Sequence, residues 1–454
     1  MWGDGVAGRL SLSRWAGLAF AGCVRDGFGM VQLSAGGGKS DGDTGLRLNE
    51  YRPAGPAPES VIQSTLNSAR RHLGMKMAYI SRVDGDKSHL VYVDAPGFEA
   101  AMHPGSVRDV SEVYCQHILD GRVPQLLPDA ACHPVTRDMQ ITHLLPVGAH
   151  ISVPIRTREG EFSFLFCCLD TEPNSSLNAR DIGVVRLFAE IAGAQIAQQE
   201  EHEHQTRQTR ERIETLIARK QFSIAYQPLW NITNARILGF ECLARFPTDP
   251  ERDPYSWFEE AESVGLLAEL ELALIEAALT SAKIFPEDVR LSINVSAGTI
   301  LHPRFADTLL AFDVSRLIIE LTEHAQISDY GAVRAALDPL RTFGVRVALD
   351  DAGSGCAGLQ HILGVNADFI KLDRSLVDSL HDSPVSRAMI AALRYFAHQT
   401  DAVIIAEGVE TREEFDALRA LGIKYAQGFF LGKPVGFKLS RELLMRAGAN
   451  GMEV

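Results

Sequence analysis

Strand-like apolar runs alternate with amphipathic helical stretches after residue 220 of this chain. Eight strands are expected, at Ser223–Leu229, Ile237–Ala244, Val289–Val295, Leu317–Leu321, Val345–Asp350, Phe369–Leu372, Val403–Ala406 and Tyr425–Leu431. The first two runs are joined only by the turn-rich Asn231–Asn234, so they should form an antiparallel hairpin. The later runs alternate with helices, which favours parallel strands. The pattern therefore predicts an α/β fold with a closed TIM-like (β/α)8 barrel.

Polar side chains recur where the predicted strands end. They are Glu241, Asn294, Glu320, Asp350 with Asp351, Lys371 with Asp373, Glu407 and Gln427. The C-terminal strand ends of such a barrel meet at one rim, which carries its chemistry. Burying so many carboxylates together is costly unless cations neutralise them. Oxygen ligands without clustered Cys or His favour Mg²⁺ or Mn²⁺ over zinc, and the adjacent Asp350 and Asp351 could bridge two ions.

The composition of the chain limits the kinds of molecule that it is expected to bind. The 454 residues carry 58 acidic and 44 basic side chains, for a net charge of −14, which argues against charge-driven binding to nucleic-acid polymers or anionic membranes. No run approaches the roughly 20 apolar residues that span a bilayer, so we expect no membrane insertion. The seven cysteines include no CxxC pair, which indicates reduced thiols in a cytoplasmic protein.

The first 57 residues differ from the rest of the chain in amino-acid composition. Trp15–Cys23 faintly resembles a lipoprotein signal, but its apolar run is short and the residues that follow are rich in Gly, Ser, Asp and Pro. We expect residues 1–57 to be a disordered leader or, alternatively, the chain to start at Met30.

An α+β domain is expected over residues 58–198. Helical and strand patterns alternate there, and Ser163–Leu169 has the composition of a buried central strand. A long helix follows, with an apolar face that disappears between Gln198 and Arg212 and resumes at Ile213. Its polar middle, residues 199–215, is interpreted as a connector that either pairs with a second copy or is a lone solvated linker.

The second half resembles the EAL-domain cyclic di-GMP phosphodiesterases, over residues 216–449. The motifs that carry the resemblance are Tyr226-Gln-Pro-Leu229, Gly239-Phe-Glu-Cys-Leu243, Asn294, Glu320-Leu-Thr-Glu323, Asp350-Asp351, Asp368-Phe-Ile-Lys-Leu-Asp373, Ala406-Glu-Gly-Val-Glu-Thr411 and Gln427-Gly-Phe-Phe-Leu-Gly-Lys-Pro434. The resemblance implies metal-dependent hydrolysis of cyclic di-GMP to linear pGpG. The alternative is a catalytically weak or silent barrel that binds cyclic di-GMP as a receptor or scaffold.

The resemblance also implies a role for each site residue. One metal, Mg²⁺ or Mn²⁺, would be held by Glu241, Asn294, Glu320 and Asp350, and a second by Asp350, Asp351 and Glu407. Lys371 would position the attacking water, with Asp373 and Gln427 supporting it. Beside two metals, Lys371 should have a lowered pKa. Glu323 would order the loop after the fifth strand, and the substrate would contact Gln227, Leu243, Arg245 and Glu410.

The sequence departs from the family pattern in two places. The signature Glu-Ala-Leu is Glu241-Cys242-Leu243, a small change that leaves the carboxylate in place. The loop after the fifth strand usually reads Asp-Asp-Phe-Gly-Thr/Ser-Gly-Tyr-Ser-Ser-Leu, whereas this chain has Ala352 and Cys356 at the two aromatic positions. Losing two aromatic anchors removes burial worth roughly 2 kcal/mol each, so we expect a more mobile loop over residues 352–358 and a lower turnover.

Residues 58–198 resemble a GAF domain. The resemblance rests on Tyr114-Cys-Gln-His-Ile-Leu119, Val123-Pro-Gln-Leu-Leu-Pro-Asp129, Gly148-Ala-His-Ile-Ser-Val-Pro154 and the strand Phe162–Leu169. Such domains sense small molecules or dimerise. The resemblance implies a sensor domain with an unknown small-molecule ligand or none. It also implies a homodimer in which the connector helix transmits the state of the sensor to the barrel. Cys115 could attach a bilin, but the preferred interpretation is a packing residue.

Overall fold

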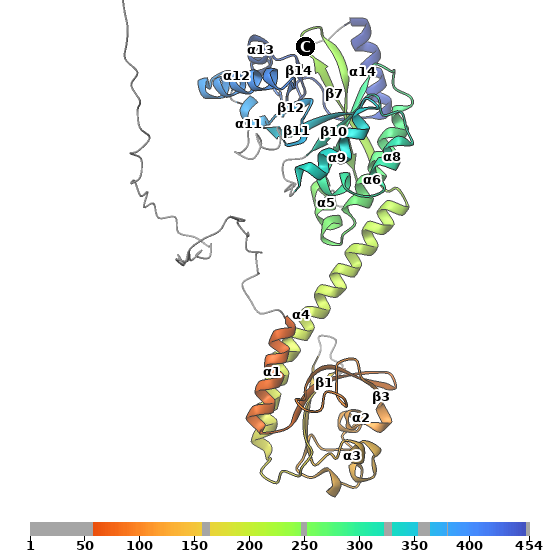
Figure 1. The fold of residues 1–454 in the computed structure, drawn as a ribbon, viewed down its shortest axis with the longest axis vertical. Helices are drawn as coiled ribbons and strands as arrows, with labels where there is room; N and C mark the ends of the chain where they lie inside the picture. Colours follow the sequence, from red (N-terminus) through yellow and green to blue (C-terminus); the bar gives the residue numbers. More distant parts are fainter. Residues whose placement is uncertain are drawn as a thin grey trace, which may run out of the picture. The chain divides into compact units, whose positions relative to one another are not determined.

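The computed structural model describes residues 58–156, 164–246, 252–321, 329–352, 364–378 and 380–450. The predicted leader and Glu323 lie outside these residues, as does most of the loop in which Ala352 and Cys356 replace aromatics. Figure 1 shows the described elements, which form an N-terminal part and a barrel.

The N-terminal part is built on one antiparallel sheet. Its elements are α1 (Pro58–Leu73), β1 (Met77–Asp84), β2 (Lys87–Asp94), β3 (Val107–Asp109), α2 (Tyr114–Leu119), β4 (Leu126–Leu127), α3 (Gln140–Leu144), β5 (Ala149–Ile155) and β6 (Phe164–Asp170). The strand order is β3-β2-β1-β6-β5-β4, so β6 is central, as its apolar sequence predicts. The strand predicted at Ser163–Leu169 corresponds to β6, over the residues that the structure describes.

Side chains of β6 alternate between two apolar clusters. Phe166 and Cys168 pack with α1 on one face of the sheet, whereas Leu165 and Cys167 pack with α2 on the other. Because both faces are covered, β6 is apolar throughout and shows no polar alternation. This two-sided burial explains the continuous apolar run in the sequence.

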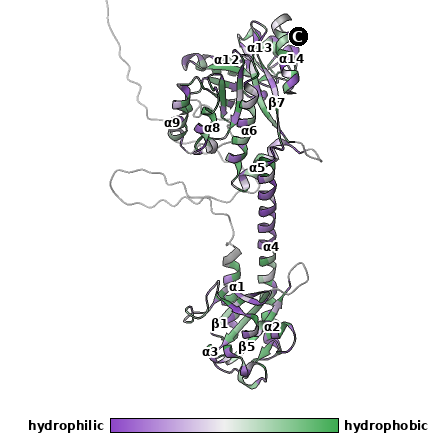
Figure 2. Ribbon diagram, turned by 90° about the vertical axis from the view of Figure 1, so that its right-hand side faces the viewer, coloured by the Kyte–Doolittle hydropathy of each residue, from purple (hydrophilic) through white to green (hydrophobic). Residues whose placement is uncertain are grey.

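A single helix, α4 (Ala179–Ala218), runs for 40 residues after the sheet. It begins with a capping box between Asn178 and Asp181. Its buried residues lie toward its two ends, Val185 to Ile196 and Ile213 to Leu216. Its middle is hydrophilic, as Figure 2 shows. The predicted polar connector is thus a continuous stretch of helix.

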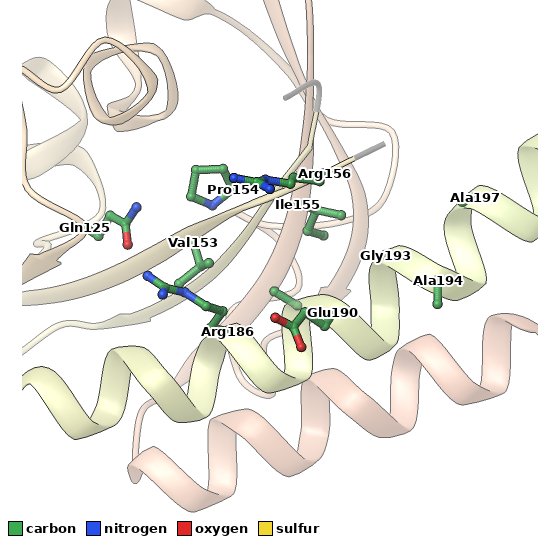
Figure 3. A pocket seen from close by; sticks show the side chains of 11 residues that line it. Gln125, Val153, Pro154, Ile155, Arg156, Arg186, Glu190, Gly193, Ala194 and Ala197 are labelled. Atoms are coloured by element: carbon green, nitrogen blue, oxygen red, sulfur yellow. The ribbon is translucent and has the colours of Figure 1, made fainter. Parts of the chain in front are cut away.

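The first half of α4 packs along α1 and the sheet (Figure 1). A cavity of about 660 Å³ lies beside it, lined by residues such as Arg156, Arg186 and Glu190 (Figure 3). Gly193 also lines this cavity, and a Cβ atom at that position would lie 2.6 Å from Cγ2 of Ile155. The close approach of α4 to β5 therefore depends on a residue without a side chain.

The barrel confirms the predicted fold. Its strands are β7 (Ser223–Asn231), β8 (Arg236–Arg245), β9 (Arg290–Val295), β10 (Leu317–Leu321), β11 (Arg346–Ala352), β12 (Phe369–Leu372), β13 (Val403–Ala406), β14 (Tyr425–Ala426) and β15 (Val435–Gly436). β7 and β8 form the predicted antiparallel hairpin, and β8 to β14 follow one another in parallel. β14 then pairs with β7 and closes the barrel.

Helices cover the outside of the barrel. They are α5 (Pro254–Ser263), α6 (Leu267–Ala282), α7 (Ala297–Ile300), α8 (Phe305–Leu310), α9 (Tyr330–Arg341), α11 (Arg374–Val377), α12 (Pro384–Gln399), α13 (Arg412–Ala420) and α14 (Phe437–Asn450). Their apolar faces and the outward side chains of the strands form one large cluster. Among the described helices, none combines the length and apolar composition that crossing a bilayer requires.

The eighth strand is shorter than predicted. The sequence pattern predicts a strand over Tyr425–Leu431, but pairing with β13 ends at Ala426. The backbone then turns, with amides of Val409 and Leu431 bonding to the carbonyls of Gln427 and Gly428. Gly428 has φ +157°, and a Cβ atom there would lie 2.2 Å from the backbone of Val409. The apolar run after Ala426 is therefore explained by packing in a turn.

Candidate active site

Strand register brings the predicted site residues together. In the parallel pair of β8 and β9, Glu241 lies opposite Ser292. In the next pair, Asn294 lies opposite Glu320. Leu321 is opposite Leu349, so Asp350 follows that pair near the C-terminal end of β11. Alternation along each strand points these side chains to the same side, which places them at one end of the barrel.

The ammonium group of Lys371 occupies the centre of this cluster. Its Nζ lies 2.6 Å from Glu407, 2.8 Å from Glu320, 3.3 Å from Asp350 and 3.9 Å from Glu241. The Glu320 contact is a hydrogen bond, whereas the Glu407 contact is an ion pair whose Oε1 makes no hydrogen bond with the described residues. One ammonium group therefore contacts four carboxyl groups.

Burial and mutual repulsion shift the ionisation of these groups. Burial raises the pKa of Glu320 to about 8 despite the attraction of Lys371, with further increases from Glu241 and Asp350. Burial also raises the pKa of Glu407 well above its usual range. Burial alone lowers the pKa of Lys371, but the four carboxylates together raise it well above its ordinary value. The lowered pKa expected for Lys371 presumed two cations beside it, and the carboxylates alone have the opposite effect.

Two amides complete the surroundings of Glu241. Asn294 donates from Nδ2 to Oε1 of Glu241 at 2.9 Å, and Gln427 donates from Nε2 to Oε2. Both predicted residues therefore lie in the cluster. Oδ1 of Asn294 is buried and has no hydrogen-bond partner within the described part of the chain. A buried acceptor without a partner is costly, and a cation would satisfy it.

Ser292 also belongs to the site, although the sequence reasoning assigned it no role. Its hydroxyl donates to Oε1 of Glu320, and the residue is 2% exposed. The signal was present, because Ser292 precedes Asn294 by two residues and so shares its face of β9. A serine on a mostly apolar strand has many possible partners, however, and only the pairing of β9 with β10 identifies Glu320.

Of two further predicted site residues, one makes a local contact and the side chain of the other lies outside the described atoms. Asp373 is the N-cap of α11, and its Oδ1 accepts a hydrogen bond of 2.9 Å from the amide of Ser375. This contact gives Asp373 a local structural role at the end of β12. Asp351 lies in β11, but its side chain is outside the described atoms, as is Glu323.

The residues predicted to contact the substrate do not all lie beside the carboxylate cluster. Leu243, Arg245 and Asn294 line one cavity of about 280 Å³ next to the carboxylate cluster. Arg245 is exposed, and its guanidinium donates a hydrogen bond to the adjacent carbonyl of Ala244, at 2.8 Å. Gln227 makes a long hydrogen bond of 3.4 Å to the carbonyl of Gly432, and Glu410 pairs with a neighbouring arginine, Arg374, at 2.9 Å. Leu243 and Arg245 thus lie beside the cluster, whereas Gln227 and Glu410 have other partners.

The donor set suits a hard divalent cation. It consists of carboxylate and amide oxygens, which Mg²⁺ and Mn²⁺ prefer. Within the described residues, no three Asp, Glu, His or Cys side chains are already arranged as ligands of a metal, because the carboxylates gather around Lys371 instead. The four carboxyl groups around Lys371 and the unpartnered Oδ1 of Asn294 nevertheless fit such an ion.

Comparison with known proteins adds independent information. Residues 210–434 match the family model for the EAL domain, and residues 56–197 match the model for the GAF domain. The chain is 30% identical over 253 residues to the cyclic di-GMP phosphodiesterase PdeL of Escherichia coli (strain K12), covering 53% of this chain and 70% of PdeL. It is 32% identical over 224 residues to the probable cyclic di-GMP phosphodiesterase PdeG of the same strain, covering 47% of this chain and 44% of PdeG.

A solved structure supports the fold. The EAL enzyme Bd1971, in its form with cAMP and cyclic di-GMP bound, matches with a TM-score of 0.50 and 19% sequence identity, covering 82% of this chain and 93% of the other. At this identity the likeness concerns the fold alone. The chain spans less than half the length of the first curated relatives that it matches.

Proposed function

Because this chain belongs to the EAL domain family, we propose that its barrel hydrolyses cyclic di-GMP to linear pGpG with two divalent cations, Mg²⁺ or Mn²⁺. The observation that carries the proposal is the gathering of Glu241, Glu320, Asp350 and Glu407 around Lys371 at one end of the barrel. A cluster of buried carboxylates destabilises the fold unless it serves to bind cations.

The proposed ligands of one ion are Glu241, Asn294, Glu320 and Asp350, and those of the second are Asp350, Asp351 and Glu407. When bound, such ions polarise a phosphodiester and lower the pKa of water. Other side chains of the protein orient these proposed ligands. Ser292 holds Glu320 from one side, while Asn294 and Gln427 hold Glu241, so the carboxylates are oriented by neutral donors.

Lys371 is proposed to orient the attacking water. An ammonium group has three N–H donors and no acceptor, so it can hold a water oxygen while contacting carboxylates. Its burial between Glu320 and Glu407 fixes its position. Asp373 would support this arrangement by capping α11 at the end of β12. Arg245, exposed beside the cavity next to Asn294, is proposed to meet a phosphate of the substrate.

Nucleotide chromatography tests the proposal. The full chain is incubated with cyclic di-GMP and either Mg²⁺, Mn²⁺ or a chelator, and the products are separated. Conversion to pGpG that depends on the metal is the expected result. Saturable binding of cyclic di-GMP without a linear product would reject the enzyme, and the absence of both would reject nucleotide recognition.

A second candidate is a catalytically silent barrel that binds cyclic di-GMP and signals through contacts. The observation in its favour is Ala352 and Cys356 at positions where the family has aromatic residues. The double variant Ala352→Phe, Cys356→Tyr separates the two. If this loop limits the enzyme, the variant should turn over faster than the parent. An unchanged or lower rate would show that the loop does not limit turnover.

The N-terminal part is proposed to act as a GAF sensor in a homodimer, with α4 transmitting its state. The support is the match of residues 56–197 to the GAF domain and the continuity of α4 through the hydrophilic stretch that follows. Sedimentation analysis of the full chain tests the dimer, and a monomer at micromolar concentration would contradict it.

A further inference from the structure

Two ion pairs join the C-terminal ends of β12 and β13, where the carboxylates gather. The inner pair is Lys371 with Glu407, whose charged atoms lie 2.6 Å apart. The outer pair is Arg374 with Glu410, at 2.9 Å, and its side chains are 57% and 36% exposed. Each member of the outer pair follows its inner counterpart by three residues. The function proposed above gives Arg374 no role.

The side chain of Arg374 also packs against the backbone of residues 407–410. A Cβ atom on Gly408 would lie 2.6 Å from Cγ of Arg374 and 2.8 Å from its Cβ. Gly408 has φ +67°, a left-handed conformation that glycine adopts without strain. Because Gly408 has no side chain, the aliphatic stem of Arg374 can lie directly against the segment that carries Glu407.

Backbone hydrogen bonds hold the same segment from its other side. The amide of Val409 donates to the carbonyl of Gln427 at 3.1 Å. The amide of Glu407 donates to the carbonyl of Leu372, the last residue of β12, at 3.2 Å. The segment therefore lies between the residues that follow β14, which hold it through the backbone, and Arg374, which holds it through a side chain.

The exposure of the outer pair indicates that it matters for position more than for stability. Exposed ion pairs contribute little to the stability of a fold. The position of a site carboxylate is more critical, because a displacement of about 1 Å can lower a rate by roughly 100-fold. Glu407 extends from this segment toward Lys371 and is a proposed ligand of the second cation. A contact that fixes the segment therefore affects the site more than the fold.

We propose that Arg374 is a positioning residue for Glu407. By packing on Gly408 and pairing with Glu410, it keeps residues 407–410 in the place where the carboxylate of Glu407 meets Lys371 and the proposed cation. Arg374 acts through Glu407 and not on the reacting atoms. This inference rests on the proposed function, because it extends the site in which that function places Glu407.

Arg412 provides a matched control. Its Nε lies 3.0 Å from Oδ2 of Asp416, and the two side chains are 53% and 54% exposed. The distance and the exposure resemble those of Arg374 and Glu410. This pair, however, lies within α13 and does not join two strand ends. Arg412→Ala therefore removes an ion pair of the same kind that has no positioning role.

Three measurements on the full chain test the proposal: calorimetric titration with Mn²⁺, steady-state turnover of cyclic di-GMP and urea unfolding. Arg374→Ala should weaken Mn²⁺ binding and lower kcat by roughly 10–100-fold each, the range for residues that orient a ligand. KM and the midpoint of urea unfolding should keep their parental values. Arg374→Lys retains an aliphatic stem and a charge, so it should recover most of the Mn²⁺ affinity. Arg412→Ala should match the parent in every quantity.

A double variant tests the contact between Arg374 and Gly408. Gly408→Ala should weaken Mn²⁺ binding, because its Cβ atom displaces the arginine stem. Arg374→Ala should weaken binding less in this background than it does in the parent, since both changes remove the same contact. Additive losses would show that the two residues act independently, and the proposed packing would be wrong.

Several results would overturn the proposal. Parental Mn²⁺ affinity in Arg374→Ala is one, and a loss that Arg412→Ala reproduces is another. Weaker binding together with a lowered urea midpoint would mean that Arg374 is merely structural. A parent that binds Mn²⁺ without turnover would reject the phosphodiesterase, whereas the Mn²⁺ affinities of the parent and of Arg374→Ala would still decide the role of Arg374. A parent that binds no Mn²⁺ would overturn both.

Discussion

Nζ of Lys371 lies 2.8 Å from Oε2 of Glu320, with both side chains almost wholly buried. The pair is not isolated, because Asp350 and Glu407 contact the same ammonium group. A buried ion pair contributes little net stability compared with an apolar pair, but removing one partner leaves uncompensated charge. The stability of the barrel thus depends on the positive charge of Lys371.

Lys371→Met should destabilise the protein strongly. Methionine has a similar length but no charge, so the buried carboxyl groups would lose the cation that stabilises their ionised forms. We expect a loss of about 3–5 kcal/mol in the free energy of unfolding, measured by urea denaturation. Added Mn²⁺ should restore part of it, because a ligand of the native state stabilises that state. Lys424→Met, at an exposed position, is the control, and a similarly small effect of both variants would refute this account.

Glu320→Gln should abolish most turnover while leaving the fold intact. Glutamine keeps the size of the side chain and an acceptor for Ser292, but it removes a proposed metal ligand. Loss of a residue that merely orients a ligand costs roughly 10–100-fold in metal affinity or activity, so we expect a loss of at least about 100-fold here. Calorimetric titration with Mn²⁺ should show weaker binding, and Glu241→Ala should behave alike. The exposed Glu413→Gln is the control. Parental rates in Glu320→Gln would mean that the ligand set is wrong.

Gly428→Ala should disturb both stability and the site. Its φ of +157° disfavours a side chain, and the new Cβ atom would lie 2.2 Å from the backbone of Val409. Strain of this kind costs about 1–3 kcal/mol, measurable by chemical denaturation. Turnover should fall as well, because the preceding Gln427 donates to Glu241. Gly436→Ala, with open space around it, should change neither quantity. Equal effects of the two variants would reject the steric explanation.

Alanine substitution at two glycines of α4 should change the stability of the protein in opposite directions. Gly193→Ala places a Cβ atom 2.6 Å from Cγ2 of Ile155, beside the cavity in Figure 3, whereas Gly183→Ala meets nothing within 4 Å. We expect Gly193→Ala to lower stability by about 1–3 kcal/mol through overpacking. Gly183→Ala should raise stability by up to about 1 kcal/mol through helix propensity. Thermal unfolding of both variants checks the pair, and a stabilising Gly193→Ala would disprove the close packing of α4 on β5.

The local pattern of apolar runs and turn residues predicted most of the barrel strands. The hairpin of β7 and β8 and the order of the parallel strands follow from apolar runs and the turn residues between them. The eighth strand was predicted too long, because residues after Ala426 are apolar for packing in a turn, and periodicity alone cannot distinguish this from a strand. Glu323 and the side chain of Asp351 lie outside the described atoms, so their roles stay predictions.

The amino-acid sequence alone determined which chemical groups this protein brings to its barrel rim, because strand ends and side-chain alternation are local properties of the chain. Tertiary structure decided which groups touch. It paired Ser292 with Glu320 and placed one ammonium group among four carboxylates. These contacts depend on inter-strand register and on helix packing, which are set by hydrogen bonds and burial between distant segments.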